Sequence, residues 1–304
     1  MKIRLSLGAF CFACLLVPSL FAQDLGPHFR KIKDGIYVET VKSAPEATSN
    51  SGIIVTTEGV VLIDSGQTAV DSREIAEAVK KLSPLAVRFI LNTETHPDHS
   101  YGHFLFPSAV VVNHEGAGAE MKQSYDPERW AKLSPEIQAA AQGFKLITPH
   151  IEYGEKLTIH LGERTFELLN LGTTHSLANT AVWLPNERVL FAASVAVPNQ
   201  INTIRPHTNI PDMFKAMNMM KALNPEVVIP GHGLPGTAEI FDNYTRYLNL
   251  LLQRVGAMVN EGKTLDQIKA ELRMPEYENL AGEKERLGNN IEAAYRTIQG
   301  GYKP

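Results

Sequence analysis

The chain has 304 residues, of which 44% are hydrophobic and 20% are charged, and its formal net charge is −4. This composition can bury a substantial core, and the length suits one large domain or one domain with an extension. The slightly acidic balance and the lack of any basic run in the sequence argue against nucleic-acid binding.

The N-terminal segment has the pattern of a secretory signal peptide. Lys2 and Arg4 precede an apolar run over residues 5–16, which is short for a membrane span, and a small residue, Ala22, stands at the expected cleavage point. We expect cleavage after Ala22, a periplasmic or secreted protein, and no stable membrane anchor afterwards. An uncleaved membrane anchor is the alternative.

Both cysteines, Cys11 and Cys14, lie within this predicted signal peptide. Cys14 is a poor candidate for lipid attachment because it lies inside the apolar run. The mature chain should therefore contain neither a disulfide nor a thiolate metal ligand.

The first half of the mature chain predicts a layer of strands with one long helix. The helix has Asp71 as its expected N-cap, Glu74 three residues later, and Pro84 at its end. Hydrophobic patterning places strands over 35–41, 50–55, 60–63, 87–91 and 110–112, with a turn at Glu58-Gly59.

The second half alternates strands and helices before it becomes purely helical. Residues 116–149 are mixed and helical, with a helix start at Ser134-Pro135-Glu136, and strands alternate over 156–197. A helix over 213–223 and a strand over 227–230 complete this part.

Three helices are expected at the C-terminal end. Residues 240–259 keep helical spacing, Gly262 stops that helix, Thr264 with Gln267 starts another, and 287–298 form the last. Packing on the core is their expected role, and a dimer surface or a wall of the active-site mouth is the alternative.

The most informative motif is Glu94-Thr95-His96-Pro97-Asp98-His99, which follows the strand over 87–91. Open α/β layers usually carry their sites at such strand ends. In an extended segment Glu94, His96 and Asp98 share one face, so they can converge, while His99 faces elsewhere and can reach a second ion.

Two further histidines follow in turn-rich settings, at Gly172-Thr173-Thr174-His175 and Pro230-Gly231-His232-Gly233. Such a set is larger than one structural zinc needs and suits two adjacent ions. Imidazole and carboxylate ligands favour zinc, and iron or manganese less exclusively. Polar loops with incidental histidines are the alternative.

This pattern resembles the metallo-β-lactamase superfamily of metallohydrolases, whose motif His-x-His-x-Asp-His precedes a distant His, an Asp, Cys or Ser, and a final His in a Gly-His-Gly setting. The likeness covers about residues 30–235. It implies an α+β fold, an αβ/βα four-layer sandwich, with the signal peptide over 1–22, the metallo-β-lactamase-like domain over 23–236 and a C-terminal helical extension over 237–304.

The resemblance also implies a ligand set for two zinc ions, with one ion, or iron or manganese, as the alternative. It assigns Glu94, His96 and His175 to one ion, and Asp98, His99 and His232 to the other. Glu94 departs from the family's first histidine, and its charge should weaken the Lewis acidity of its ion or favour a harder metal.

Three residues are expected to support the ligands. Asp64 matches the family residue that braces the metal loop, and carboxylates commonly fix ligand imidazoles in this way. Ser194 stands where the family has a bridging Asp or Cys, and is expected to hydrogen-bond a metal-bound water or to serve tight packing. His103 is a supporting or substrate-side residue, or a substitute ligand.

Substrate recognition is assigned to the loop over 199–211, with Asn202, Arg205 and His207 as candidates. An arginine there can bind a substrate carboxylate, although a solvated loop charge is equally consistent. Trp130 and Phe144 are candidate pocket residues, with core packing as their alternative role.

We expect an exported zinc-dependent hydrolase in which metal-bound hydroxide attacks a carbonyl of a small molecule, with Asp98 orienting the hydroxide and carrying a proton to the leaving group. A β-lactam is the leading substrate, although the lysine of one β-lactamase subclass and aromatic flap residues in the 43–51 loop are missing. The alternatives are a lactonase or thioester hydrolase, a mononuclear iron oxygenase and a non-catalytic metal-binding protein. A homodimer stays open.

Overall fold

The computed structural model describes residues 24–40, 49–66, 68–125, 135, 139 and 142–302. The predicted signal peptide, Trp130, most of the 43–51 loop and most of the expected helix start at residues 134–136 lie outside the described residues. Among the described residues, no helix combines the length and the apolar character that a membrane span requires.

The first sheet has seven strands in sequence order, antiparallel from β1 to β4 and parallel from β4 to β7. The short first and last strands were not predicted, because neither has a clear apolar pattern. The strands are β1 (Phe29–Lys33), β2 (Ile36–Glu39), β3 (Ser51–Thr56), β4 (Gly59–Ile63), β5 (Val87–Leu91), β6 (Val110–His114) and β7 (Ile151–Tyr153).

The second sheet has five strands in the order β12-β11-β10-β9-β8, with only β11 and β12 parallel. Its strands fall within the ranges predicted for the second half of the chain. They are β8 (Lys156–Leu161), β9 (Arg164–Asn170), β10 (Thr180–Leu184), β11 (Val189–Phe191) and β12 (Val227–Ile229).

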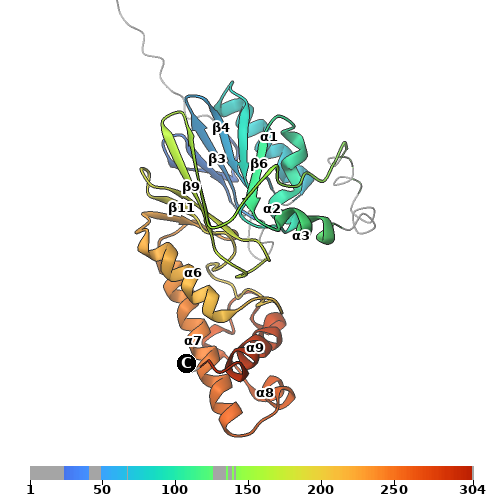
Figure 1. Ribbon diagram of the computed structural model, residues 1–304, viewed down its shortest axis with the longest axis vertical. Coiled ribbons are helices and arrows are strands. Elements are labelled where there is room, and N and C mark those ends of the chain that lie inside the picture. The colour runs from blue at the N-terminus through green and yellow to red at the C-terminus, as the bar shows by residue number, and fades with distance from the viewer. Residues whose placement is uncertain are drawn as a thin grey trace, which may run out of the picture.

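Three hydrophobic clusters define the layers of the sandwich. One lies between the two sheets, and a second joins the outer face of the first sheet to α1 (Ala69–Leu82). The third joins the outer face of the second sheet to α6 (Ile210–Ala222) and the C-terminal helices. The predicted four-layer α+β arrangement with a helical C-terminal part is confirmed (Figure 1).

The start of α1 differs from the prediction. Thr68, not Asp71, is the N-cap, and its hydroxyl oxygen accepts a hydrogen bond from the backbone N–H of Asp71 at 3.2 Å. Asp71 lies in the first turn and accepts a hydrogen bond from the Thr68 hydroxyl at 2.8 Å. Both residue types cap helices well, so the sequence alone did not separate the two registers. The helix ends at Leu82, two residues before Pro84, as predicted.

The C-terminal helices are α7 (Glu239–Asn260), α8 (Leu265–Glu271) and α9 (Glu283–Gln299), which extend below the sandwich in Figure 1. The predicted capping box at the start of α8 is present, because the Thr264 and Gln267 side chains each bond the other's backbone N–H. The buried face of α7 belongs to the same hydrophobic cluster as α6 and the second sheet.

Residue Leu168 offers a test of the core between the sheets. It is fully buried in β9, so Leu168→Ala should lower the free energy of unfolding by about 2–5 kcal/mol through lost burial and a residual cavity. Leu85 is 41% exposed, and Leu85→Ala should change it by less than about 0.5 kcal/mol. Urea unfolding followed by circular dichroism measures both, and equal losses would contradict the layer assignment.

Candidate metal centre

The motif that begins at Glu94 lies at the carboxyl end of β5, where the chain changes from extended to helical. His96 is still extended, with φ −64° and ψ 147°, and the short helix α2 (Pro97–Ser100) starts at the next residue. The expectation that Asp98 shares a face with Glu94 and His96 is therefore wrong. The helical turn carries Asp98 and His99 toward His232 instead.

The remaining ligand candidates come from loops that follow β9, β11 and β12. His175 lies between β9 and β10, Ser194 follows β11, and His232 follows β12. The loop of His232 is fixed by Asn50, whose side-chain amide donates to the carbonyls of Pro230 at 2.8 Å and Gly233 at 2.7 Å. Strand ends from both sheets thus meet at one edge of the sandwich, the usual location of sites in layered α/β folds.

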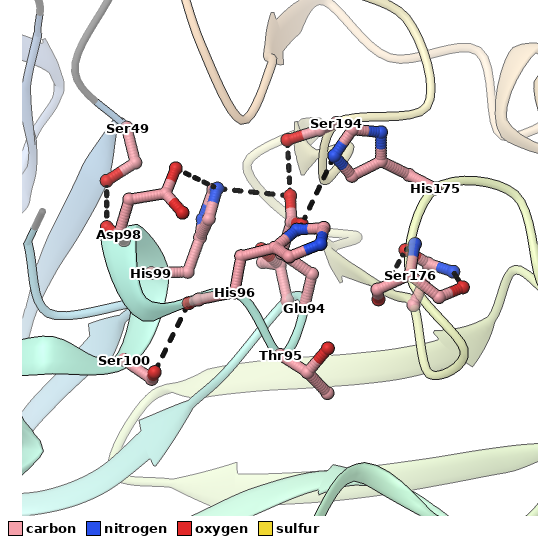
Figure 2. Close-up of polar contacts among 12 residues, drawn as sticks. Ser49, Glu94, Thr95, His96, Asp98, His99, Ser100, His175, Ser176 and Ser194 are labelled. Carbon is pink, nitrogen blue, oxygen red and sulfur yellow. Dashed lines mark hydrogen bonds and ion pairs between the residues drawn. The ribbon is translucent and has the colours of Figure 1, made fainter. Parts of the chain in front are cut away.

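Glu94 lies at the centre of this cluster and is fully buried (Figure 2). Its Oε2 contacts Nδ1 of His96 and lies 3.5 Å from Nε2 of His175. Its Oε1 lies 3.0 Å from Nε2 of His99 and accepts a hydrogen bond from the Ser194 hydroxyl. The two oxygens of one carboxylate therefore face two different sets of histidines.

The second set of ligand atoms is closely grouped. Nε2 of His99 lies 3.3 Å from Nε2 of His232, and Oδ2 of Asp98 lies 3.5 Å from the first and 3.3 Å from the second. The backbone carbonyl of Asp98 accepts a hydrogen bond from the Ser49 hydroxyl, which fixes the helical turn.

These donor atoms fit metal ions. Two atoms that each lie about 2.1 Å from one tetrahedral ion are about 3.4 Å apart. This matches the 3.5 Å between Oε2 of Glu94 and Nε2 of His175 and the 3.3–3.5 Å separations among Asp98, His99 and His232. Two groups of three residues each have ligand atoms that lie within 4.8 Å of one another. One group is Glu94, His96 and His175, and the other is Glu94, His99 and His232. Nitrogen and carboxylate donors are those that zinc and related ions prefer.

Asp64 braces the cluster from behind. Its Oδ1 accepts from the Asn92 side-chain amide at 2.8 Å and the Thr93 backbone N–H at 2.7 Å. Its Oδ2 accepts from the Thr93 hydroxyl at 2.6 Å and from Nδ1 of His99 at 2.8 Å. The last contact leaves Nε2 of His99 pointing at Glu94 and Asp98. Asp64 itself has φ +57°, a left-handed conformation that Asp and Asn tolerate better than most residues.

The charges in the cluster balance one another. Burial raises the pKa of Glu94, but its electrostatic interactions with His99, His175 and His96 outweigh burial and hold that pKa well below its usual range. Burial lowers the pKa of His99, and the carboxylates of Glu94, Asp98 and Asp64 raise it well above its usual range. The partners of Glu94 in these interactions are histidines, the side chains that a metal ion would take over as ligands.

Ser194 connects the centre to the C-terminal helices. Its backbone carbonyl accepts from the Asn202 side chain at 2.8 Å, and the Asn202 carbonyl accepts from the Asn290 side chain of α9 at 2.9 Å. Asn202 is only 6% exposed and points inward. The prediction that Asn202 binds substrate is therefore replaced by a supporting position behind Ser194.

Arg205 and His207 lie beside His175. His207 is exposed and its Nε2 donates to the His175 carbonyl at 3.2 Å. Burial lowers the pKa of His175 to about 3 against the opposing effect of Glu94, and the charges of His96 and Arg205 add to the lowering. Nε of Arg205 is buried and has no hydrogen-bond partner among the described residues. His175 is thus neutral, as a ligand must be, and Arg205 has donor capacity to spare.

Two other predicted residues lie away from the ligand atoms. His103 is buried and its Nδ1 donates to the Ile147 carbonyl at 3.2 Å, and it belongs to neither group of ligand atoms found among the described residues. Burial lowers its pKa to about 4. Phe144 packs against Tyr101 and Tyr125, with ring centroids 4.9 Å and 5.8 Å away, as an aromatic cluster behind the metal loop.

One important residue, Glu120, was not predicted from the sequence. Its carboxylate accepts from the Thr95 hydroxyl at 2.6 Å and from the Leu177 backbone N–H at 3.0 Å, which ties the loop of His96 to the loop of His175. Glu120 lies in α3 (Ala117–Ser124), whose sequence has the pattern of an ordinary surface helix. Its role depends on contacts 25 and 57 residues away, which no local pattern reveals.

Comparison with known proteins places these features in a family. The sequence profile described as the metallo-beta-lactamase superfamily matches residues 44–232. The chain is 30% identical over 115 residues to the metallo-beta-lactamase type 2 of Bacteroides fragilis, covering 36% of this chain and 45% of that protein. It is 20% identical over 291 residues to the linear primary-alkylsulfatase of Pseudomonas sp. (strain ATCC 19151), covering 81% of this chain and 54% of that protein.

Solved structures share the fold. The sec-alkylsulfatase Pisa1 from Pseudomonas sp. matches with a TM-score of 0.66 and 16% identity, covering 90% of this chain and 50% of that one. A metallo-beta-lactamase from Pontibacter korlensis matches with a TM-score of 0.56 and 21% identity, covering 70% of this chain and 94% of that one. The chain spans about half the length of the two curated relatives described above.

Replacing Asp64 tests its bracing role. Asp64→Asn keeps the shape and the left-handed backbone but places an amide N–H₂ against hydrogen-bond donors. We expect zinc affinity to fall about 10- to 100-fold, as for other residues that orient ligands, and the free energy of unfolding to fall by about 1–3 kcal/mol. Asp34→Asn is the control, since its side chain is 99% exposed. Chelator competition and thermal unfolding measure both effects, and unchanged zinc affinity would remove Asp64 from this role.

Proposed function

The chain belongs to the metallo-β-lactamase superfamily, and we propose that it is an exported, zinc-dependent hydrolase of a small anionic substrate. The observation that carries the proposal is the pair of ligand groups that meet at Glu94. Metal ions bound there would supply a hydroxide nucleophile at neutral pH and would polarise the attacked bond.

Asp98 is the residue that we propose for proton transfer. Its side chain is 27% exposed, whereas those of Glu94 and Asp64 are 0% and 2% exposed, so it is the carboxylate of the centre within reach of a substrate. Burial raises the pKa of Asp98, but His99 and His232 outweigh burial and hold it below its usual range. Asp98 is therefore ionised at neutral pH and can accept a proton and pass it to a leaving group.

Arg205 is the proposed anchor for the anionic group of the substrate. Its Nε is buried without a partner among the described residues, and its charge reaches His175. A guanidinium with free donors binds carboxylate or sulfate oxygens in a fixed orientation. Such an anchor beside His175 would place the reacting bond over the metal centre.

A β-lactam is the leading substrate class in this proposal. Its support is the likeness to metallo-β-lactamases, including 30% identity over 115 residues to that of Bacteroides fragilis. An alkyl sulfate is the second candidate, because the likeness to the alkylsulfatase covers 81% of this chain, against 36% for the Bacteroides β-lactamase. Both substrate classes carry the anionic group that Arg205 would bind.

Export rests on the N-terminal pattern alone, with Lys2 and Arg4 before an apolar run and Ala22 at the expected cleavage point. An exported hydrolase would meet small molecules that arrive from outside the cell. Intact mass of the protein recovered from the periplasm would show whether the chain begins at residue 23.

A substrate panel tests the proposed activity. Zinc-loaded protein should hydrolyse at least one penicillin, cephalosporin or carbapenem, and chelator should abolish the turnover until zinc is restored. Primary and secondary alkyl sulfates, lactones and acyl thioesters complete the panel under the same conditions. Turnover of alkyl sulfates alone would establish the second candidate, and no turnover of any member by fully loaded protein would reject the hydrolase proposal.

Arg205→Ala tests the anchor. For the substrate identified in the panel, we expect KM to rise about 10- to 100-fold, because a hydrogen-bonded ion pair that contributes about 1.5–3 kcal/mol is lost. Arg205→Lys should recover only part of the affinity, since lysine lacks the planar pair of donors. Arg30→Ala, at an exposed position in β1, is the control and should leave KM unchanged. An unchanged KM in Arg205→Ala would exclude Arg205 from substrate binding.

A further inference from the structure

We infer that Glu94 bridges the two metal ions, with one carboxylate oxygen bound to each. The inference rests on the metal centre of the proposed function but not on the substrate. It differs from the expectation that Glu94 serves only the ion of His96 and His175.

Oε2 of Glu94 faces the first set of donor atoms. This oxygen contacts Nδ1 of His96 and lies 3.5 Å from Nε2 of His175. The two imidazole rings are 5.0 Å apart between centroids and nearly perpendicular, at 81°, so their nitrogens converge on Oε2 and do not stack. Three donor atoms therefore surround one position, which is the ligand number of catalytic zinc sites with an open coordination position.

Oε1 of Glu94 faces the second set of donor atoms. This oxygen lies 3.0 Å from Nε2 of His99, which lies 3.3 Å from Nε2 of His232. Oδ2 of Asp98 is within 3.5 Å of both nitrogens. The ligand atoms of Glu94, His99 and His232 all lie within 4.8 Å of one another, so Oε1 has a second set of histidines to share an ion with.

The Glu94 side chain is held in a position in which its two oxygens face both sets of donor atoms. It is fully buried, and the Ser194 hydroxyl donates to Oε1. A carboxylate oxygen can accept more than one interaction, so this hydrogen bond leaves Oε1 free to bind an ion. Ser194 contributes no charge of its own. Its Oγ occupies the space that a side chain at position 231 would need, since a Cβ there would lie 2.3 Å from it. Glu94, and not Ser194, is therefore the anionic side chain that faces both sets.

Zinc titration against a chromophoric chelator tests the inference, because it yields a separate dissociation constant for each ion without any assay of activity. The wild type should bind two ions. His96→Ala should weaken only one ion, by about 100-fold or more, and leave the other within about threefold. Glu94→Gln should weaken both ions by at least about tenfold, since an amide binds zinc poorly at either oxygen position.

Two matched controls accompany these variants. Glu77→Gln changes an exposed glutamate of α1 and should leave both constants unchanged. Ser194→Ala removes the hydroxyl but keeps the carboxylate, so both ions should still bind. Circular dichroism confirms that each variant is folded.

The outcomes separate this inference from the proposed function. If Glu94→Gln weakens the same single ion as His96→Ala, Glu94 serves one ion and the inference is wrong, while the hydrolase proposal stands. If the wild type binds no zinc, both fail. A crystal structure of the zinc-loaded wild type gives an independent result, because anomalous scattering would show whether Oε1 and Oε2 lie on different ions.

Discussion

The carboxylate of Asp64 is the interaction on which the rest of the centre depends. It accepts four hydrogen bonds, from Asn92, twice from Thr93, and from His99. These bonds join the end of β4 to the loop after β5 and fix the orientation of one imidazole. That loop also carries Glu94 and His96, so a substitution of Asp64 would displace several donor atoms together. A buried carboxylate with four donors has no reason to move when a metal ion binds or leaves.

Charge explains why so many acidic groups are tolerated in one buried place. Glu94 and Asp64 are almost fully buried, and isolated buried carboxylates are costly unless they are paired. Here the compensation comes from histidines, whose charge depends on protonation, and a divalent ion can replace those protons directly. Metal binding should therefore release protons while the carboxylates keep their positions. The centre is preorganised, and the ligands need little rearrangement to receive an ion.

Much of this arrangement was predicted from the sequence. The strands and helices followed from hydrophobic periodicity, the four layers from the resemblance to the family, and the ligand candidates from the spacing of the histidines. Predictions from local sequence were wrong where the backbone changes from extended to helical within one motif. This happens at Pro97, where a helical turn moves Asp98 away from the face of His96. They also failed where a side chain acts over a long sequence distance. Asn202 lies in a loop that suggested substrate contact, yet it bonds Ser194 and Asn290, and Glu120 joins two loops that no sequence pattern connects to it.

The bonds between Ser194, Asn202 and Asn290 have a consequence for the evolution of this chain. The segment around Asn202 is held from the far side by α9, through Asn290 and through Arg286, whose guanidinium donates to the Ile201 carbonyl at 2.5 Å. The C-terminal helices therefore do not form an independent unit that can be exchanged between homologues. Recombination between homologues with a crossover near residue 237 would combine the loop of one parent with the α9 of the other. Hybrids that keep residues 201–290 from a single parent should therefore be the ones that fold.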